Sequence, residues 1–549
     1  MLKKAGWGAL VGGLLTAALM GVLYLANQAA GAPFTPFDLF NWVTRVLPGD
    51  LVTFGIDSMI SAMRLLGLSV VDLAKTAERI SAILQFLGIG IVLGAVFFVI
   101  LSRQKITNGR TAGLIVGALF GLPIIGISLA ITQTDMLPLL SLVWLLVIFL
   151  VWGWLLGFSY SRLFAPEVSL AEPMEETAAA GDGSVRQVGR RKFLVQLGAG
   201  TALITVVGAG IGKILAQAEQ RRLDEELAAT MAHNSEEASP KPFPNSDDPV
   251  TPVPGTRPEY TPVKDHYEVF IQTEPTVIDG ASWILPITGM VDNPLMLTLD
   301  DFQQNYDSMD QYVTLSCISG RIGTGLISTT QWTGVSVQDV LADAGVQDGA
   351  KYLFITSGDG FYESIALDLI NSDRRIMFCY AWDGNLLPHD HGFPLRVWIP
   401  DRFGMKQPKW ITGIEVTDEY HEGYWVERNW DEVAQVKTTS VIDTVVAQSA
   451  GEDGQGDRKV LVGGIAFAGA RGISQVQVRV DGGAWEDAEL RSPLSETTWV
   501  IWRYEWPFTE GEHLFEVRCA EADGTPQIEE TMGSRPSGAT GIHSVQANI

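Results

Sequence analysis

Cysteine, histidine and positive charge are all scarce in this 549-residue chain. The three cysteines, Cys317, Cys379 and Cys519, are far apart and form no C-x-x-C pair, which excludes a zinc knuckle, a ferredoxin-type cluster and a haem c attachment site. All seven histidines follow residue 232, so the apolar N-terminal segments offer no histidine pair for a b-type haem. We therefore expect no haem and at most one cysteine with a chemical role.

The shortage of positive charge is confined to one part of the chain. Residues 1–222 carry 17 Lys and Arg against 12 Asp and Glu, whereas residues 223–549 carry 21 against 51. An acidic surface of this kind repels phosphate backbones, so we expect no binding to nucleic acid. The same contrast predicts two unlike parts.

Long apolar runs occur in the first 216 residues, and five of them reach the roughly 20 residues needed to cross a bilayer. They lie at about 6–26, 82–102, 111–132, 138–160 and 193–216. The connection at 34–79 has apolar residues at helical spacing, including Trp42, Ile60 and Leu66, which predicts one or two interfacial or docked helices. Residues 1–216 are thus expected to form a five-helix transmembrane anchor.

Basic residues near the ends of these runs predict the orientation of the anchor. They precede the first run, fill the loop between the second and third, and precede the fifth, while the loop 132–137 has none. A cytoplasmic N-terminus, with everything after about 217 outside the plasma membrane, satisfies all of these positions. The basic residues are Lys3, Lys4, Arg103, Lys105, Arg110, Arg186, Arg190, Arg191 and Lys192.

The segment Gly189-Arg-Arg-Lys-Phe-Leu194 resembles a twin-arginine export signal, although three positive-inside charges would give the same local pattern. After the last span, residues 217–262 read as a helical extension and a proline-rich linker that forms a solvated spacer. Residues 263–436 mix strands with short helices, which predicts an α+β domain. Residues 437–549 contain short strands at regular intervals, which predicts an immunoglobulin-like β-sandwich.

Two segments of the α+β region carry residues suited to chemistry. Cys317 ends a strand-like run and precedes a glycine-rich turn with Arg321, so it suits a metal ligand or a nucleophile, unless it is a buried structural cysteine. Cys379 and Cys519 lie in alternating strands and are expected in the core. The second segment gathers four groups that suit an anion site, unless they are ordinary surface charges. These groups are His391, Arg396, Lys406 and Lys409.

From about residue 263 to the end, the chain resembles the sulfite oxidase superfamily of molybdopterin oxidoreductases. The resemblance rests on several motifs in the family's order: Trp283 to Phe302, Leu315-Ser-Cys317, Trp332-x-Gly334, Asp390-His-Gly-Phe-Pro-Leu-Arg396, Lys409-Trp410 and Val480-Asp-Gly-Gly-x-Trp485. It implies a molybdenum-molybdopterin cofactor whose metal is bound by Cys317. It also implies that the C-terminal domain is of the dimerisation type.

The resemblance assigns roles to further positions. His391, Arg396 and Lys409 fall on positions that hold the pterin and its phosphate, and Asp359 falls near another. The segment Lys264-Asp265-His266 aligns with a cofactor segment in which the family has Arg where this chain has Lys264, and Lys lacks the bidentate fork. Arg321 matches a basic position after the cysteine. The family's active-site tyrosine corresponds best to Tyr420, with His421 and Tyr424 as alternatives.

These assignments predict a membrane-anchored molybdenum oxidoreductase that transfers oxygen to or from a small sulfur- or nitrogen-containing substrate. The acidic surface weakens long-range steering of anions, so a neutral sulfoxide or N-oxide is at least as plausible as sulfite. Electrons would pass to a separate carrier, such as a cytochrome, a quinone or a membrane redox subunit. A homodimer is a further expectation. The competing hypothesis is a non-catalytic membrane-tethered binding or adhesion protein that keeps the fold without the cofactor.

Overall fold

The computed structural model describes residues 2–47, 51, 54, 55, 58, 59, 63, 70–104, 106, 108–131, 136–164, 189–232, 242–448 and 458–549. The chain forms two compact units. One comprises Met1–Leu47 and Leu73–Asp224, and the other comprises Pro48–Asp72 and Glu225–Ile549. We describe each unit by itself.

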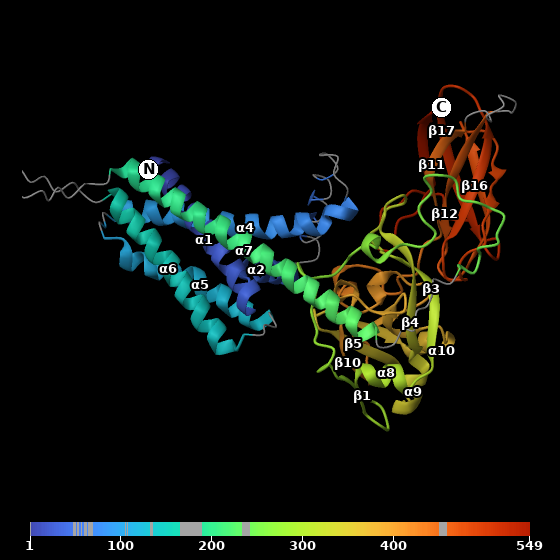
Figure 1. Ribbon diagram of the computed structural model, residues 1–549, viewed down its shortest axis with the longest axis horizontal. Helices are drawn as coiled ribbons and strands as arrows, with labels where there is room; N and C mark the ends of the chain where they lie inside the picture. The colour runs from blue at the N-terminus through green and yellow to red at the C-terminus, as the bar shows by residue number, and fades with distance from the viewer. Residues whose placement is uncertain are drawn as a thin grey trace, which may run out of the picture. The chain divides into compact units, whose positions relative to one another are not determined.

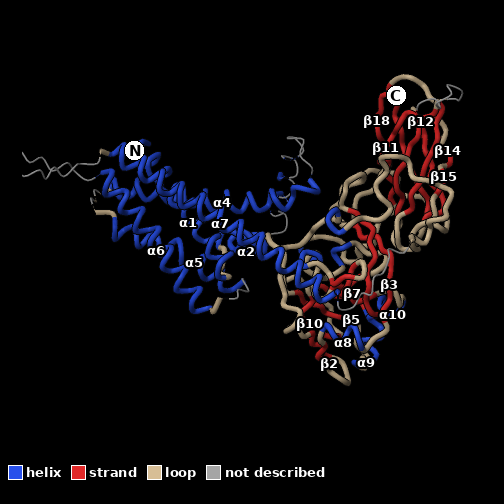
Figure 2. The backbone as a smooth tube through the Cα atoms, in the orientation of Figure 1, coloured by secondary structure: helices blue, strands red, loops and turns tan. Residues whose placement is uncertain are grey.

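The described part of the first unit is helical, as Figure 2 shows in blue. Its helices are α1 (Leu2–Ala30), α2 (Thr35–Val46), α4 (Val70–Arg103), α5 (Arg110–Ile131), α6 (Pro138–Phe164) and α7 (Arg190–Ala232). All except α2 are long and apolar enough to cross a membrane, which confirms the five expected runs. The amphipathic α2 matches the first predicted docked helix. Ile60, Leu66, Lys105, Arg186 and residues 132–135 lie outside the described residues.

Glycines allow the long apolar helices of this unit to approach closely. A Cβ added to Gly117 on α5 would lie 2.5 Å from the carbonyl oxygen of Phe149 on α6, and one on Gly153 would lie 2.3 Å from that of Gly113. Gly12 on α1 meets α4 in the same way. Since lipid provides no hydrophobic driving force between helices, such small-residue contacts are the expected source of association.

The second unit begins with an α+β domain built on two sheets (Figure 1). The first has the order β2-β1-β10-β5-β6, with β1 parallel to β10. The second has the order β3-β4-β7-β8, with β9 on β7. Its strands and helices are β1 (Leu285–Gly289), β2 (Leu295–Leu297), α8 (Leu299–Gln304), β3 (Ser308–Ser316), β4 (Ile327–Ser336), α9 (Val337–Ala344), β5 (Tyr352–Ser357), β6 (Tyr362–Ala366), α10 (Leu367–Ser372), β7 (Met377–Trp382), β8 (Asn385–Leu386), β9 (Arg396–Trp398) and β10 (Ile411–Thr417).

The apolar residues of this domain converge on β7. Every residue from Met377 to Trp382 is buried, because both faces of the strand are covered. Cys379 is therefore a core residue, as predicted. The described part of this domain also contains short 3-10 turns. They are η1 (Val263–Asp265), η2 (His389–His391), η3 (Gly404–Lys406) and η4 (Val426–Arg428).

The C-terminal domain consists of two four-stranded sheets, ordered β11-β12-β16-β15 and β14-β13-β17-β18. Val462 and Trp502 from the first sheet share a core with Phe515 and Cys519 from the second, so the sheets pack face to face. The strands are β11 (Thr439–Gln448), β12 (Lys459–Phe467), β13 (Ile473–Val480), β14 (Glu486–Asp487), β15 (Glu489–Leu490), β16 (Val500–Pro507), β17 (Glu512–Glu521) and β18 (His543–Asn548). The immunoglobulin-like topology stays a prediction.

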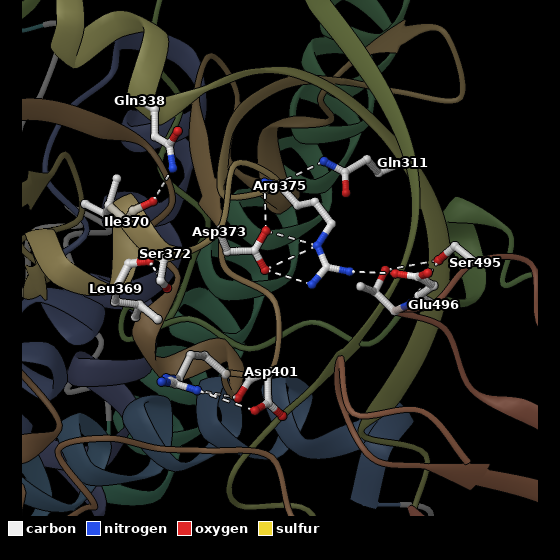
Figure 3. Close-up of polar contacts among 12 residues, drawn as sticks. Gln311, Gln338, Leu369, Ile370, Ser372, Asp373, Arg375, Asp401, Ser495 and Glu496 are labelled. Atoms are coloured by element: carbon white, nitrogen blue, oxygen red, sulfur yellow. Dashed lines mark hydrogen bonds and ion pairs between the residues drawn. The ribbon is translucent and has the colours of Figure 1, made fainter. Parts of the chain in front are cut away.

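The two domains of this unit are joined by polar contacts at their boundary. The Arg375 guanidinium donates hydrogen bonds from Nε and Nη2 to the Asp373 carboxylate and from Nη1 to the Glu496 carboxylate at 3.2 Å (Figure 3). Ser495, the neighbour of Glu496, donates a hydrogen bond to the carbonyl of Tyr312 on β3. The strand that ends at Cys317 is thus braced by the C-terminal domain.

The prediction of a solvated proline-rich spacer is wrong for residues 242–262. Arg257 forms a bidentate ion pair with Asp443 of β11, and Arg491 donates to the carbonyls of Asn245 and Val250. Val253 is 3% exposed. Charge-assisted hydrogen bonds and apolar burial therefore dock this segment on the C-terminal domain. Pro240 and the rest of 233–241 lie outside the described residues.

Candidate functional site

Cys317 lies at the end of β3, where the strand gives way to a tight turn. Its backbone N–H donates to Leu326, and its carbonyl accepts from Gly320. The Sγ atom lies 3.1 Å from the Oγ of Ser319. The thiol is partly exposed, and burial raises its pKa, with the Ser319 hydroxyl acting in the opposite direction.

Two histidines that are 125 positions apart in the sequence meet in the interior. The rings of His266 and His391 have centroids 5.1 Å apart, and each lies 4.8 Å from the ring of Trp382. His266 directly follows η1, and His391 ends η2. The two residues are 5% and 3% exposed. Burial lowers both pKa values, that of His266 to about 3, so both imidazoles are neutral at pH 7.

Two cations complete this cluster. Arg396 is buried on β9, with its guanidinium 4.3 Å above the Trp332 ring and one N–H donating to the carbonyl of His391. Lys409 donates to the carbonyl of Asp390 and lies 4.4 Å from the ring of Trp410. Burial lowers the pKa of Arg396 to about 10. We call His266, His391, Arg396 and Lys409 the cationic cluster.

Two buried nitrogens of the cationic cluster have no hydrogen-bond partner among the described residues. They are Nε2 of His266 and Nε of Arg396. An unpaired buried polar atom costs about 1–3 kcal/mol, and a buried charge costs more without a counter-charge. The Nε–H of Arg396 and the ammonium of Lys409 therefore suit an anionic group such as a pterin phosphate, whereas Nε2 of His266, whose Nδ1 donates to the Tyr267 carbonyl, suits a hydrogen-bond donor.

Tyr267 connects the cationic cluster with Cys317. The centroid of its ring lies 5.0 Å from that of His266 in a stacked arrangement. Burial raises the pKa of Tyr267, and the nearby Cys317 raises it further. A Cβ on Gly404 would lie 3.6 Å from both the Tyr267 hydroxyl and the carbonyl oxygen of Ser316. The thiol and the cluster therefore belong to one site.

A small cavity adjoins Cys317 on the side of the C-terminal domain. It has a volume of about 50 Å³ and is partly open. Arg321 and Lys437 contribute the cations, with the hydroxyl-bearing Thr324 and Thr439 and the apolar Phe403 beside them. This lining suits a small molecule that carries oxygen atoms.

Other predicted residues have the following surroundings. Lys264 and Asp265 are exposed on η1, and Tyr420 is 37% exposed, with its ring against Tyr352. Asp359 is buried and accepts a hydrogen bond from the N–H of Phe361.

Lys406 is buried, and its ammonium pairs with Glu363 at 2.6 Å. Sequence reasoning missed Tyr267, Trp382, Lys437 and Glu363. Only Tyr267 had a signal, since it follows His266 directly.

Comparison with known proteins identifies the family of this domain. Residues 272–425 match the family model described as the oxidoreductase molybdopterin binding domain. The mitochondrial sulfite oxidase of Macaca fascicularis is 28% identical over 271 residues, covering 42% of this chain and 50% of that protein.

Two further relatives extend the comparison. The uncharacterized oxidoreductase YuiH of Bacillus subtilis is 32% identical over 153 residues, covering 28% of this chain and 73% of that protein. The NADPH nitrate reductase of Fusarium oxysporum is 27% identical over 260 residues, covering 39% of this chain and 29% of that protein. The chain spans about half the length of the sulfite oxidases that it matches.

Proposed function

This chain belongs to the sulfite oxidase family of molybdopterin-binding oxidoreductases, and on that premise we propose that it is a membrane-anchored enzyme acting outside the plasma membrane. Its reaction would transfer an oxygen atom to or from a small sulfur- or nitrogen-containing substrate. The observation that carries this proposal is the cationic cluster, in which Nε2 of His266 and Nε of Arg396 are buried without a hydrogen-bond partner among the described residues.

The cofactor would be held from two sides. His266, His391, Arg396 and Lys409 would hold the pterin and its phosphate, and the Cys317 thiolate would bind the metal. When bound, the molybdenum cofactor supplies two-electron chemistry with exchange of an oxygen atom.

The chain's own residues would set the conditions for that chemistry. The neutral imidazole of His266 offers its Nε2 to a polar atom of the cofactor. The buried guanidinium of Arg396 would stabilise an anionic group where water is largely excluded. Trp332 and Trp382 cover these groups, which strengthens each electrostatic contact. Little reorganisation is then needed when the cofactor binds.

The cavity beside Cys317 is the proposed substrate site. Arg321 and Lys437 would orient the oxygen atoms of a substrate, while the acidic surface of residues 223–549 opposes the approach of anions from a distance. We therefore place neutral sulfoxides and N-oxides beside sulfite as candidates. The relatives include both a sulfite oxidase and a nitrate reductase, so either direction of transfer suits the family.

The remaining parts of the proposal concern location and partners. The five apolar helices would anchor the enzyme with its N-terminus in the cytoplasm, and Arg190 and Arg191 would direct export of the loaded domain. A separate cytochrome, quinone or membrane redox subunit would exchange electrons with the site. The C-terminal domain would support a homodimer.

An oxygen-atom-transfer screen tests the proposed function. Full-length protein in detergent is offered sulfite, dimethyl sulfoxide and trimethylamine N-oxide, with an artificial electron carrier, beside the variant Cys317→Ser. We expect turnover of at least one substrate in wild type and loss of turnover in the variant with an unchanged unfolding midpoint. Full turnover by Cys317→Ser would refute the role of the thiolate.

A further inference from the structure

A buried ion pair lies beneath the loop that leads to the cationic cluster. Glu363 on β6 is 0% exposed, and its Oε1 accepts hydrogen bonds from the Lys406 ammonium at 2.6 Å and from the N–H of Ser364 at 2.9 Å. Lys406 also donates to the carbonyl of Ser364 at 3.2 Å. A pair held this way loses little side-chain entropy, but each charge depends on the other.

Lys406 belongs to η3, which touches both halves of the site. Phe403, which precedes η3, lines the cavity beside Cys317. Gly404 packs against the Tyr267 hydroxyl and the carbonyl of Ser316, as described above. Lys409 of the cationic cluster lies three residues after Lys406. A shift of η3 would therefore move the cavity wall and a cluster cation together.

The same carboxylate supports the segment that follows β10. A Cβ added to Gly423 would lie 2.2–2.4 Å from three atoms of the Glu363 carboxyl group, so the backbone of this segment rests directly on it. Ser364 donates a hydrogen bond to the carbonyl of His421, and Tyr424 donates its N–H to the carbonyl of Tyr362. β6 thus joins η3 to the segment 421–424 through one buried carboxylate.

We propose that Glu363 is a positioning residue that fixes η3, and with it Phe403 and Lys409, by neutralising Lys406 under the site. Lys406 is then no cofactor-binding cation, although the residue types of its segment predicted it to be part of the anion site. Its charge is already satisfied inside the protein, and its ammonium is directed to β6. This inference rests on the proposed function, because the group that Lys409 would hold is the cofactor phosphate.

Three variants separate this role from phosphate binding: Glu363→Gln, Lys406→Met and the double variant. Each is produced as the full-length chain in a host that makes molybdopterin. Molybdenum and pterin per folded chain, KM, kcat and the unfolding midpoint are measured. Glu415→Gln, an exposed change on β10, is the control.

If Glu363 positions the loop, Glu363→Gln leaves a buried charge unsatisfied. We expect pterin to be retained about tenfold more weakly. Leaving a buried polar group unsatisfied costs about 1.4 kcal/mol, which corresponds to a tenfold change in affinity. Lys406→Met leaves the buried Glu363 carboxylate without its partner, so it should also lose pterin, whereas the double variant, which buries no unpaired charge, should stay within about twofold of wild type. Recovery in the double variant is a result that general destabilisation would not give.

The opposite pattern would overturn the inference. If Lys406 bound the phosphate, Lys406→Met and the double variant would lose pterin equally, and Glu363→Gln would keep it. If Glu363→Gln fails to fold, the other two variants still decide between these patterns. Absence of pterin from wild type and from Glu415→Gln would instead overturn the proposed function.

Discussion

Replacing Arg396 by Met should change stability in opposite directions with and without the cofactor. Burial lowers the pKa of Arg396 to about 10, which corresponds to about 3 kcal/mol of disfavoured charge in the unloaded protein. The hydrogen bond to the His391 carbonyl and the contact with Trp332 offset about two-thirds of this cost. We therefore expect Arg396→Met to raise the free energy of unfolding of the unloaded protein by about 1 kcal/mol, or about 2 °C in midpoint.

In the loaded protein the same change removes the cation opposite a buried anion. Truncating one partner of such a pair costs about 2–5 kcal/mol, so the loaded variant should be less stable and should lose pterin. Thermal unfolding of full-length protein from hosts with and without the cofactor pathway measures both signs.

The control for this comparison is Arg374→Met, which removes an exposed arginine paired with Asp339. Its effect should be small and equal in both preparations. Equal destabilisation of both preparations by Arg396→Met would refute the reasoning, since it would make Arg396 a structural residue only.

Three further predictions follow from other parts of the chain. Burial lowers the pKa of His266 to about 3, below its unfolded value, so its contribution is complete above about pH 6.5 and is lost as pH falls from there toward 3. In urea unfolding of the unloaded protein, the free energy of unfolding should fall by about 1.4 kcal/mol less per pH unit below pH 6.5 in His266→Gln than in wild type. An unchanged dependence on pH in the variant would contradict this. Gly153→Leu should separate α5 from α6 and cost about 1–3 kcal/mol in detergent unfolding, whereas Gly210→Leu, whose added Cβ meets nothing within 4 Å, should not. Replacing Arg190 and Arg191 by Lys should leave the C-terminal part inaccessible to external protease, and unchanged cleavage would argue against twin-arginine export.

Much of the fold was predictable because it depends on local patterns. Apolar length fixes the five long helices, and alternation identifies strands such as β5 and β13. The burial of Cys379 follows from its place in an apolar strand. The docked segment 242–262 was not predictable, because Arg257 and Arg491 find their partners about 190 and 240 positions away.

The site shows the same division. Sequence motifs mark Cys317, His391, Arg396 and Lys409 as candidates, and the structure brings His391 and Arg396 into contact. The partner of Lys406 was invisible, since Glu363 is 43 positions earlier and reads as an ordinary strand residue. Tyr420 was chosen by its distance from Lys409-Trp410, but distance along the chain does not report which way a loop turns its side chain.

The central claim is that the cationic cluster and Cys317 hold a molybdenum cofactor. The most direct measurement is the content of molybdenum and extractable molybdopterin in full-length protein purified from a host that makes the cofactor. We predict about one of each per chain, with loss of molybdenum in Cys317→Ser. Protein that is folded and free of both would contradict the account and favour a binding protein that has kept only the fold.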